Sequence, residues 1–196
     1  AILRLARIRE TSFPLISTLQ PIVDRLSEVT GESGHASMAS EAGLTTIALC
    51  EPNRSTRVWI DPSQVLPFHA TASGIVYLAH LPKAEADALH VRTSDRKYTV
   101  ETVSRDELQH RMQEARRLGY AKSIGGFEVD TAGFAAPVFD WHGRVIATMG
   151  LACVRSRLDE ARHADLIREV VLAANTATRA FGGRLPEVAA PSGDQR

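Results

Sequence analysis

Two apolar runs joined by a four-residue turn constrain the fold of this chain most strongly. The runs cover residues 134–139 and 144–154, and the turn between them is Asp140-Trp141-His142-Gly143. An aspartate at the start and a glycine at the end are typical of tight turns between paired strands. The runs are therefore predicted to form an antiparallel hairpin at the centre of a sheet, with Trp141 at the surface.

The periodicity of apolar residues predicts the other elements around this hairpin. Spacings of three and four residues predict helices over 12–30, 73–80, 83–89, 104–118 and 158–181. Short apolar runs predict further strands over 34–39, 44–51, 58–60 and 120–124. Ser104 and Glu107 form a capping box, and Gly119 ends the helix that this box begins. Strands and helices in this mixed order imply an α/β chain of the α+β type, in which helices cover an antiparallel sheet.

Composition argues against several classes of protein. A chain of 196 residues with 44% hydrophobic content suits one globular domain with its own core. Its 23 basic and 23 acidic residues cancel, whereas a domain that grips DNA by itself usually has a basic face. No apolar run is long enough to span a membrane and no signal peptide is evident, so we expect a cytoplasmic protein without a membrane partner. Cys50 and Cys153 lie in apolar runs and are predicted to be core thiols.

Motifs for catalysis, metals and nucleotides are missing from the sequence. Ser73 lacks the surrounding glycines of a nucleophile elbow, and a capping role explains it more simply than catalysis with nearby His69. The seven histidines show neither metal-ligand spacing nor a cluster with cysteine. No glycine-rich nucleotide fingerprint occurs. We therefore expect no enzymatic activity, no dedicated metal site and no cofactor.

A loop that leads into a helix contains the best candidate for a binding site. Residues 66–74 place small and hydroxyl residues before an apolar helix, so Thr71 or Ser73 can cap the first helical turn. Ala72, Ser73 and Gly74 are small enough for another molecule to approach the backbone donors of that turn. Such a site would bind acceptor atoms. The alternative is an ordinary capped start of a helix.

Three stretches together carry a family pattern. They are residues 67–76 (Pro-Phe-His-Ala-Thr-Ala-Ser-Gly-Ile-Val), residues 119–123 (Gly-Tyr-Ala-Lys-Ser) and the hairpin at 134–147. In order and spacing they resemble the C-terminal effector-binding domain of the IclR family of bacterial transcription regulators, over roughly residues 13 to 183. The resemblance implies a GAF-like fold, in which a curved antiparallel sheet of about six strands is flanked by helices and encloses a small-molecule cavity.

The same resemblance implies a domain organisation. IclR-family proteins carry an N-terminal winged helix-turn-helix, so DNA would be bound only through a domain outside this chain. Residues 1–12 would be the remnant of the linker to it, or an amphipathic surface segment, and residues 13–185 the effector-binding domain. Residues 186–196, rich in proline, alanine, serine and glycine, are predicted to be a disordered tail. Family members act as dimers and often tetramers, so a homodimer or homotetramer is expected.

The expected ligand-binding residues follow from where this sequence departs from the family pattern. Members that bind small oxo-acids have polar groups at positions where this chain has Ser123, residues 130–133, Gly150 and Ala152. Loss of those groups predicts a roomier apolar cavity for an aromatic or hydrophobic compound, with at most one polar end held at Ala72 and Ser73. The alternative is a domain that has lost ligand binding and serves assembly alone. The predicted ligand-binding residues are Trp59, Leu66, Ala72, Ser73, Gly74, Ser123, Gly133, Met149, Gly150 and Ala152.

The leading hypothesis is an effector-sensing and oligomerisation domain of a DNA-binding transcription regulator, in which a small metabolite modulates transcription. Two alternatives differ in class. One is a GAF-like sensory domain attached to a different output, and the other is a small-molecule enzyme built on the same fold.

Overall fold

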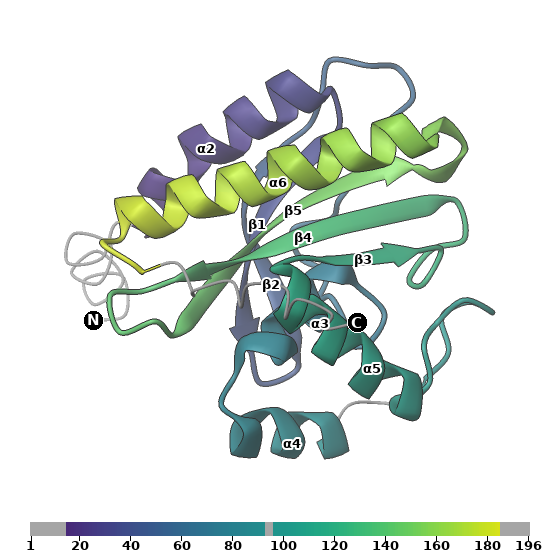
Figure 1. Cartoon of the computed structure of the whole chain (residues 1–196). Helices are drawn as coiled ribbons and strands as arrows, with labels where there is room; N and C mark the ends of the chain where they lie inside the picture. The colour runs from purple at the N-terminus through teal and green to yellow at the C-terminus, as the bar shows by residue number, and fades with distance from the viewer. Residues whose placement is uncertain (1–14, 93–95, 185–196) are drawn as a thin grey trace, which may run out of the picture.

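A single antiparallel sheet organises the described part of this computed structural model, residues 15–92 and 96–184. Five strands are present there in the order β2-β1-β5-β4-β3, and every neighbouring pair is antiparallel. The predicted hairpin is confirmed, since β4 and β5 pair along most of their length (Figure 1). The expectations for residues 1–12 and 186–196 lie outside the described residues. The strands are β1 (Ser33–Ser40), β2 (Gly43–Cys50), β3 (Ala121–Ile124), β4 (Thr131–Phe139) and β5 (Val145–Val154).

Helices cover both faces of the sheet. α2 (Leu15–Thr30) and α6 (Glu160–Ala180) pack side by side on one face (Figure 1). α3 (Ala72–His80) and α5 (Arg105–Leu118) pack together on the other face, and α4 (Lys83–Arg92) lies beside α3. A short 3-10 helix, η1 (Arg155–Arg157), joins β5 to α6. This arrangement confirms the predicted α+β fold with an antiparallel sheet between helices.

Local signals in the sequence set three of the helix boundaries. Thr71 caps α3, because its side-chain oxygen accepts a hydrogen bond from the Gly74 amide at 3.1 Å. Ser104 caps α5 in the same way, accepting from the Glu107 amide at 3.2 Å. Gly119 ends α5 with a φ of 77°, a left-handed conformation that glycine adopts without steric cost.

One predicted strand is wrong. Residues 58–60 form an irregular segment, so the described sheet has five strands rather than about six. The Ser33 hydroxyl holds this segment by donating to the Val58 carbonyl at 2.6 Å, and β2 instead meets the chain at an isolated bridge between Leu44 and Leu66. The side chain of Trp59 is 66% exposed. The run therefore belongs to an irregular loop in which Trp59 is exposed and Ile60 is buried.

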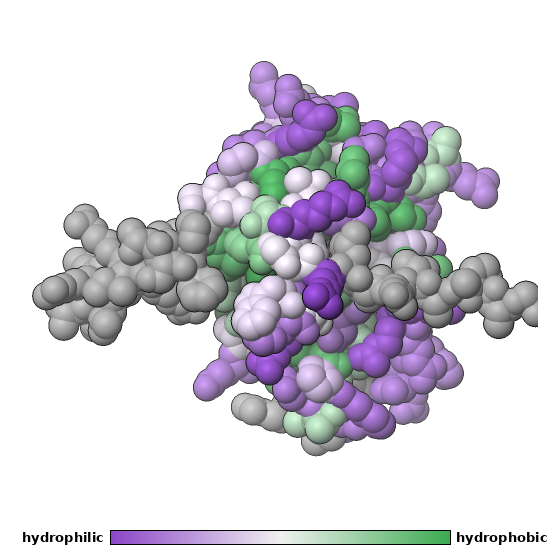
Figure 2. Space-filling model, turned by 60° about the vertical axis from the view of Figure 1, so that its left-hand side comes forward, coloured by the Kyte–Doolittle hydropathy of each residue, from purple (hydrophilic) through white to green (hydrophobic). Residues whose placement is uncertain are grey.

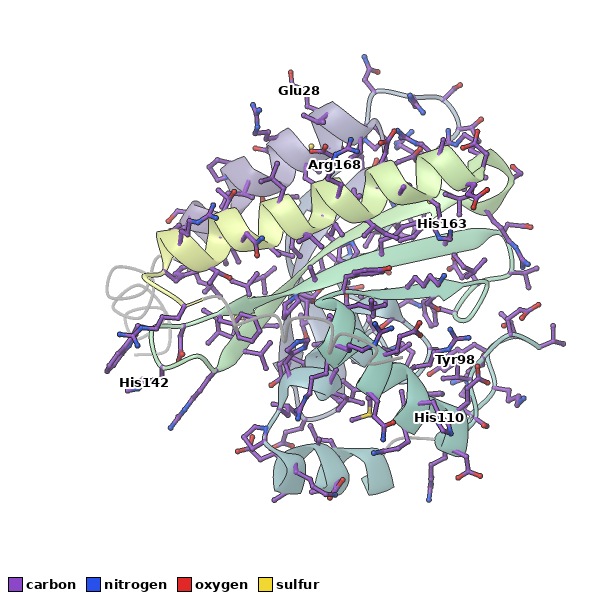
Figure 3. All side chains as sticks on the ribbon, in the orientation of Figure 1. Glu28, Tyr98, His110, His142, His163 and Arg168 are labelled. Atoms are coloured by element: carbon purple, nitrogen blue, oxygen red, sulfur yellow. The ribbon has the colours of Figure 1, made fainter. Side chains whose placement is uncertain are left out.

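Alternation of side chains along the strands separates two cores. The core against α2 and α6 contains large side chains of β4 and β5, among them Phe134, Met149 and Leu151, all fully buried. The core against α3 and α5 is built around Ile75, Leu78 and Leu108. On α6, His163 lies edge-on to Phe134 with the ring centroids 5.0 Å apart (Figure 3).

The two cysteines have different environments. Cys153 is buried in the core against α2 and α6, and burial raises the pKa of its thiol to about 12. Cys50 is only partly buried, so the prediction of a core thiol is confirmed for Cys153 alone. Both are free thiols.

Two surface features complete the fold. Trp141 is exposed in the turn between β4 and β5, as predicted, and the adjacent His142 marks that turn in Figure 3. No helix in the described residues has both the length and the apolar character that crossing a membrane would need.

We expect Leu166→Ala to lower the free energy of unfolding by about 2–5 kcal/mol, because the substitution leaves a cavity in the core. Leu166 of α6 is fully buried against the sheet, whereas Leu172 of the same helix is 54% exposed. Leu172→Ala is the matched control and should change stability by less than about 0.5 kcal/mol. Urea unfolding measures both, and equal losses would contradict the buried face of α6 described above.

Candidate ligand-binding cavity

A cavity of about 90 Å³ lies where the N-terminus of α3 meets the sheet. Its walls come from β1, β3, β4, β5, the first turn of α3, the loop that joins β2 to α3, and the loop that joins β3 to β4. One liquid water occupies about 30 Å³, so the free volume suits a few water molecules or a small ligand. The cavity therefore adjoins the stretch that the sequence singled out.

The first turn of α3, whose residues line this cavity, contains backbone donors that the helix leaves unpaired. Thr71 uses its hydroxyl oxygen to cap Gly74 and donates to the Pro67 carbonyl at 2.9 Å. The helical ladder begins at the Ile75 amide, which donates to the Thr71 carbonyl at 3.0 Å. The amides of Ala72 and Ser73 therefore have no acceptor within the helix, and both residues line the cavity. The positive end of the helix dipole adds to their affinity for an acceptor atom.

A histidine from β1 lies beside this turn. The Nε2 atom of His35 is 3.3 Å from the hydroxyl oxygen of Ser73, and the ring is only 6% exposed. Gly150 of β5 makes room for it, because a β-carbon at that position would overlap the ring. The Nδ1 atom of His35 is buried and has no hydrogen-bond partner among the described residues. A buried nitrogen without a partner is costly, and one beside a cavity can be satisfied by a bound molecule.

Burial keeps His35 uncharged. Desolvation lowers the pKa of its imidazole from 6.5 to about 4, so the neutral ring predominates at pH 7. A neutral imidazole has one donor nitrogen and one acceptor nitrogen. His35 and Ser73 therefore offer hydrogen bonds without charge next to the two free amides.

The rest of the wall is mostly apolar. Trp59, Leu66 and Phe127 contribute large side chains, and Gly133 and Ala152 contribute small ones. Ser123 also lines the cavity, but its hydroxyl donates to the Ala70 carbonyl at 2.8 Å. Glu128, an exposed residue, also belongs to the lining. The balance of these groups favours a ligand that is apolar apart from one hydrogen-bonding end.

The structure brings most of the predicted site residues to the cavity. Those that line it are Trp59, Leu66, Ala72, Ser73, Ser123, Gly133 and Ala152.

Three predicted residues do not line the cavity. Met149 faces the opposite side of the sheet, toward α2 and α6, because side chains alternate along β5. Gly74 is packed against the backbone of Phe68, where a β-carbon would clash. Gly150 lies under the His35 ring, and its lack of a side chain leaves room for that ring.

Sequence reasoning missed several members of the wall. His35, Gln64, Phe127 and Glu128 line the cavity but were not predicted. The loop residues Gln64, Phe127 and Glu128 carry no periodic signal. The only available signal for His35 was a polar residue in the middle of a short run of small strand residues.

The pKa of His35 makes stability depend on pH. Its folded value of about 4 lies below the unfolded value of 6.5, so the unfolded state binds more protons between these two pH values. Stability is therefore complete above about pH 6.5 and falls by about 3 kcal/mol as the pH drops to about 4. Urea unfolding at pH 7.5, 6, 5 and 4 measures this loss.

Two variants isolate the contribution of His35. We expect His35→Gln to reduce the pH dependence, whereas His110→Gln on the exposed face of α5 should leave it unchanged. His80 and His163 also have pKa values lowered by burial, so the informative quantity is the difference between variant and wild type. A His35→Gln protein with the same pH dependence as wild type would contradict the neutral, buried histidine.

Comparison with known proteins identifies the family. Residues 10–179 match the family model described as "Bacterial transcriptional regulator IclR C-terminal". The HTH-type transcriptional regulator XynR of Escherichia coli K12 is 30% identical over 158 residues, which cover 80% of this chain and 63% of XynR. The chain thus spans less than two thirds of the length of this relative.

Solved structures agree with this match. The crystal structure of an IclR transcriptional regulator from Silicibacter sp. TM1040 has a TM-score of 0.89 and 30% identity, covering 95% of this chain and 74% of the other. The inducer-binding domain of the transcription factor PobR from Acinetobacter, a double mutant in complex with 3-hydroxybenzoic acid, has a TM-score of 0.73 at 19% identity, covering 81% of this chain and 94% of the domain. These relatives are transcription regulators rather than enzymes, as the sequence predicted. The chain belongs to the IclR family of bacterial transcriptional regulators and corresponds to the family's C-terminal domain.

Proposed function

We propose that this domain senses a small-molecule effector in the cavity at the N-terminus of α3 and thereby modulates the activity of a transcription regulator. The observation that carries the proposal is the pair of free amides at Ala72 and Ser73, which line a cavity together with the uncharged His35. Membership of a regulator family supports the same role.

DNA would be bound by a part of the regulator other than this domain. The chain has equal numbers of basic and acidic residues, which does not favour a DNA-binding face. XynR is named as an HTH-type regulator and extends beyond the part that this chain matches. A GAF-like sensory domain attached to another output is the alternative, and the sequence that adjoins residue 1 in the gene distinguishes the two.

The regulator would act as a homodimer or homotetramer. Ile16, Val29 and Leu172 are exposed apolar side chains on the α2 and α6 layer. Figure 2 shows apolar patches between hydrophilic side chains on one side of the molecule. Patches of this kind are common at protein interfaces, and symmetric homo-oligomers are the most frequent assemblies.

The effector would be an aromatic or otherwise hydrophobic compound with one polar end. Its polar atom would accept hydrogen bonds from the Ala72 and Ser73 amides, and its apolar part would contact the walls near Trp59 and Leu66. An engineered cavity of about 150 Å³ holds benzene, whereas this one measures about 90 Å³. The cavity is partly open to solvent, so an aromatic ligand larger than the free volume would extend toward the opening or displace a wall, and the expected roomier cavity would form in the second case. The PobR domain shows that a relative of this fold holds an aromatic acid.

Calorimetry with a panel of compounds tests the ligand class. The panel contains 3-hydroxybenzoate, benzoate and phenol as aromatic probes, and glyoxylate and pyruvate as short oxo-acids. We expect at least one aromatic probe to bind more tightly than both oxo-acids, because burial of apolar area stabilises the complex by about 25 cal/mol per Å². Tighter binding of glyoxylate or pyruvate than of every aromatic would overturn the proposed ligand class. No binding by any probe would favour a domain that serves assembly alone.

Ala72→Pro tests the proposed polar contact. Proline removes the amide donor of the first helical residue but is tolerated there, and Thr71 before it already has the extended backbone that precedes proline (φ −119°, ψ 148°). We expect affinity for the best aromatic probe to fall by about tenfold, the value of one hydrogen bond to a polar ligand group.

A matched control for this substitution is available on α6. Glu160→Pro changes the first residue of α6, which also follows a capping residue with extended backbone, Asp159. It should leave affinity unchanged. Equal affinities of Ala72→Pro and wild type, with both proteins folded, would contradict binding at the Ala72 amide.

A further inference from the structure

A buried carboxylate lies at the junction between the sheet, the α2 and α6 layer and the loop after β2. The Glu32 side chain is only 2% exposed. Its Oε2 atom is 3.0 Å from the Nη2 atom of Arg157, and its Oε1 atom is 3.4 Å from Nη2 of Arg162 and 3.8 Å from Nη1 of Arg54. We call Glu32 and these three arginines the Glu32 cluster.

The Glu32 cluster connects the cavity wall to both helices of the opposite layer. Arg157 also donates from Nη1 to the Thr56 carbonyl at 3.0 Å, two residues before the wall begins at Val58. Arg162, in the first turn of α6, also donates to the carbonyl of Thr30, the last residue of α2. The Glu32 carboxylate therefore orients two arginines whose other hydrogen bonds reach the wall loop and the end of α2, and one of these arginines lies at the start of α6.

The Glu32 cluster has more positive than negative charges, so its arginines depend on the Glu32 carboxylate to stay close together. Three guanidinium groups meet one buried carboxylate, and the side chains of Arg157 and Arg162 are each 30% exposed. Removing the carboxylate would leave these partly buried cations close together without a compensating charge, which is unfavourable. The contacts to Thr56 and Thr30 would then be lost with the arginine positions.

The loop that the cluster holds is the part of the cavity wall best able to move. Residues 51–60 contain no strand and no helix, and the described contacts that fix this stretch are few. Ser33 donates to the Val58 carbonyl, Arg57 pairs with Glu51 at 2.7 Å and donates to the Arg54 carbonyl at 3.2 Å, and Pro52 and Ile60 are buried. The Glu32 cluster adds the contacts of Arg54 and of the Thr56 carbonyl. Sites of low local stability are where proteins open most easily.

We infer that Glu32 is a positioning residue that latches the wall loop of the cavity and couples it to the ends of α2 and α6. Outward movement of the Val58–Trp59 wall by a ligand would displace Thr56 and thus Arg157, which shares the Glu32 carboxylate with Arg162 on α6. The role in signalling rests on the proposed effector function. The latch can be tested in the protein without any ligand. A failed latch is therefore distinguishable from a failed effector function.

The test uses trypsin, which cleaves after arginine, on Glu32→Gln and wild type under native conditions. Arg54 and Arg57 report on the latched loop, and Arg111 and Arg117 on α5 report on the rest of the fold. We expect cleavage after Arg54 and Arg57 to be about tenfold faster in Glu32→Gln, with less than about a twofold change after Arg111 and Arg117, because α5 has no contact with the Glu32 cluster in the described residues. Mass spectrometry resolves the four sites.

Three further variants separate a latch from general destabilisation. Val170→Ala weakens the core between α6 and the sheet without touching the cluster, and should raise cleavage at all four sites together. Glu32→Asp keeps the charge and should restore part of the wild-type protection of the loop. Arg157→Lys keeps the cation but replaces the two nitrogens that separately reach Thr56 and Glu32 with one, so it should loosen the loop even if Glu32→Gln proves too unstable to purify.

Hydrogen exchange tests the coupling to the helices. Glu32→Gln should lose protection in the last turn of α2 and the first turn of α6, but not in α5. Wild-type cleavage rates after Arg54 and Arg57 in both Glu32→Gln and Arg157→Lys would overturn the latch. A rise spread evenly over all four sites, as in Val170→Ala, would overturn it as well.

Discussion

The alternation of side chains along β4 and along residues 147–153 of β5 is the constraint on which the rest of this structure depends. On the face toward α2 and α6, Phe134, Met149 and Leu151 fill a dense core. On the face toward α3, Gly133, Gly150 and Ala152 are small, and the nearest side-chain atom to a β-carbon at Gly133 would be 3.6 Å away on Ala72. Large residues on one face give the sheet its stability, and small residues on the other leave space for a cavity and for the His35 ring.

The start of α3 adds unpaired hydrogen-bond donors to this space. A helix always leaves donors unpaired in its first turn, and Thr71 satisfies only one of them. The Ala72 and Ser73 amides remain, beside a histidine that burial keeps neutral. The site can thus hold an acceptor atom through hydrogen bonds and the helix dipole, without a charged side chain at that point. The Glu32 cluster adds a physical connection between the cavity wall and the opposite helical layer.

The sequence predicted most of the fold because its local signals agree with the tertiary structure. The β4–β5 hairpin, the capped starts of α3 and α5, and the left-handed glycine at 119 all depend on residues close together in the chain. Residues 58–60 misled the prediction, because a short apolar run can line a cavity from a loop as well as fill a strand. Trp59 is such a case, with an exposed ring on a cavity wall.

Fewer of the cavity residues could be predicted, because many of them are placed by strand register or by partners distant in sequence. Ala72 and Ser73 could be inferred from the chemistry of a helix start. Met149 and Gly150 are adjacent in sequence, yet they lie on opposite faces, and only the register of β5 decides which face meets the cavity. His35 and Glu32 depend on partners 38 and 125 residues away, so no local pattern identifies their roles.

The central claim is that a ligand in this cavity is held by the first amides of α3. Nuclear magnetic resonance of the ¹⁵N-labelled domain tests it most directly, with 3-hydroxybenzoate as the probe. We expect the amide proton signals of Ala72 and Ser73 to move downfield on saturation, while those of Arg105 and Glu160, the first residues of α5 and α6, stay in place. Saturation that shifts other signals but leaves Ala72 and Ser73 unchanged, or no shift of any signal, would contradict it.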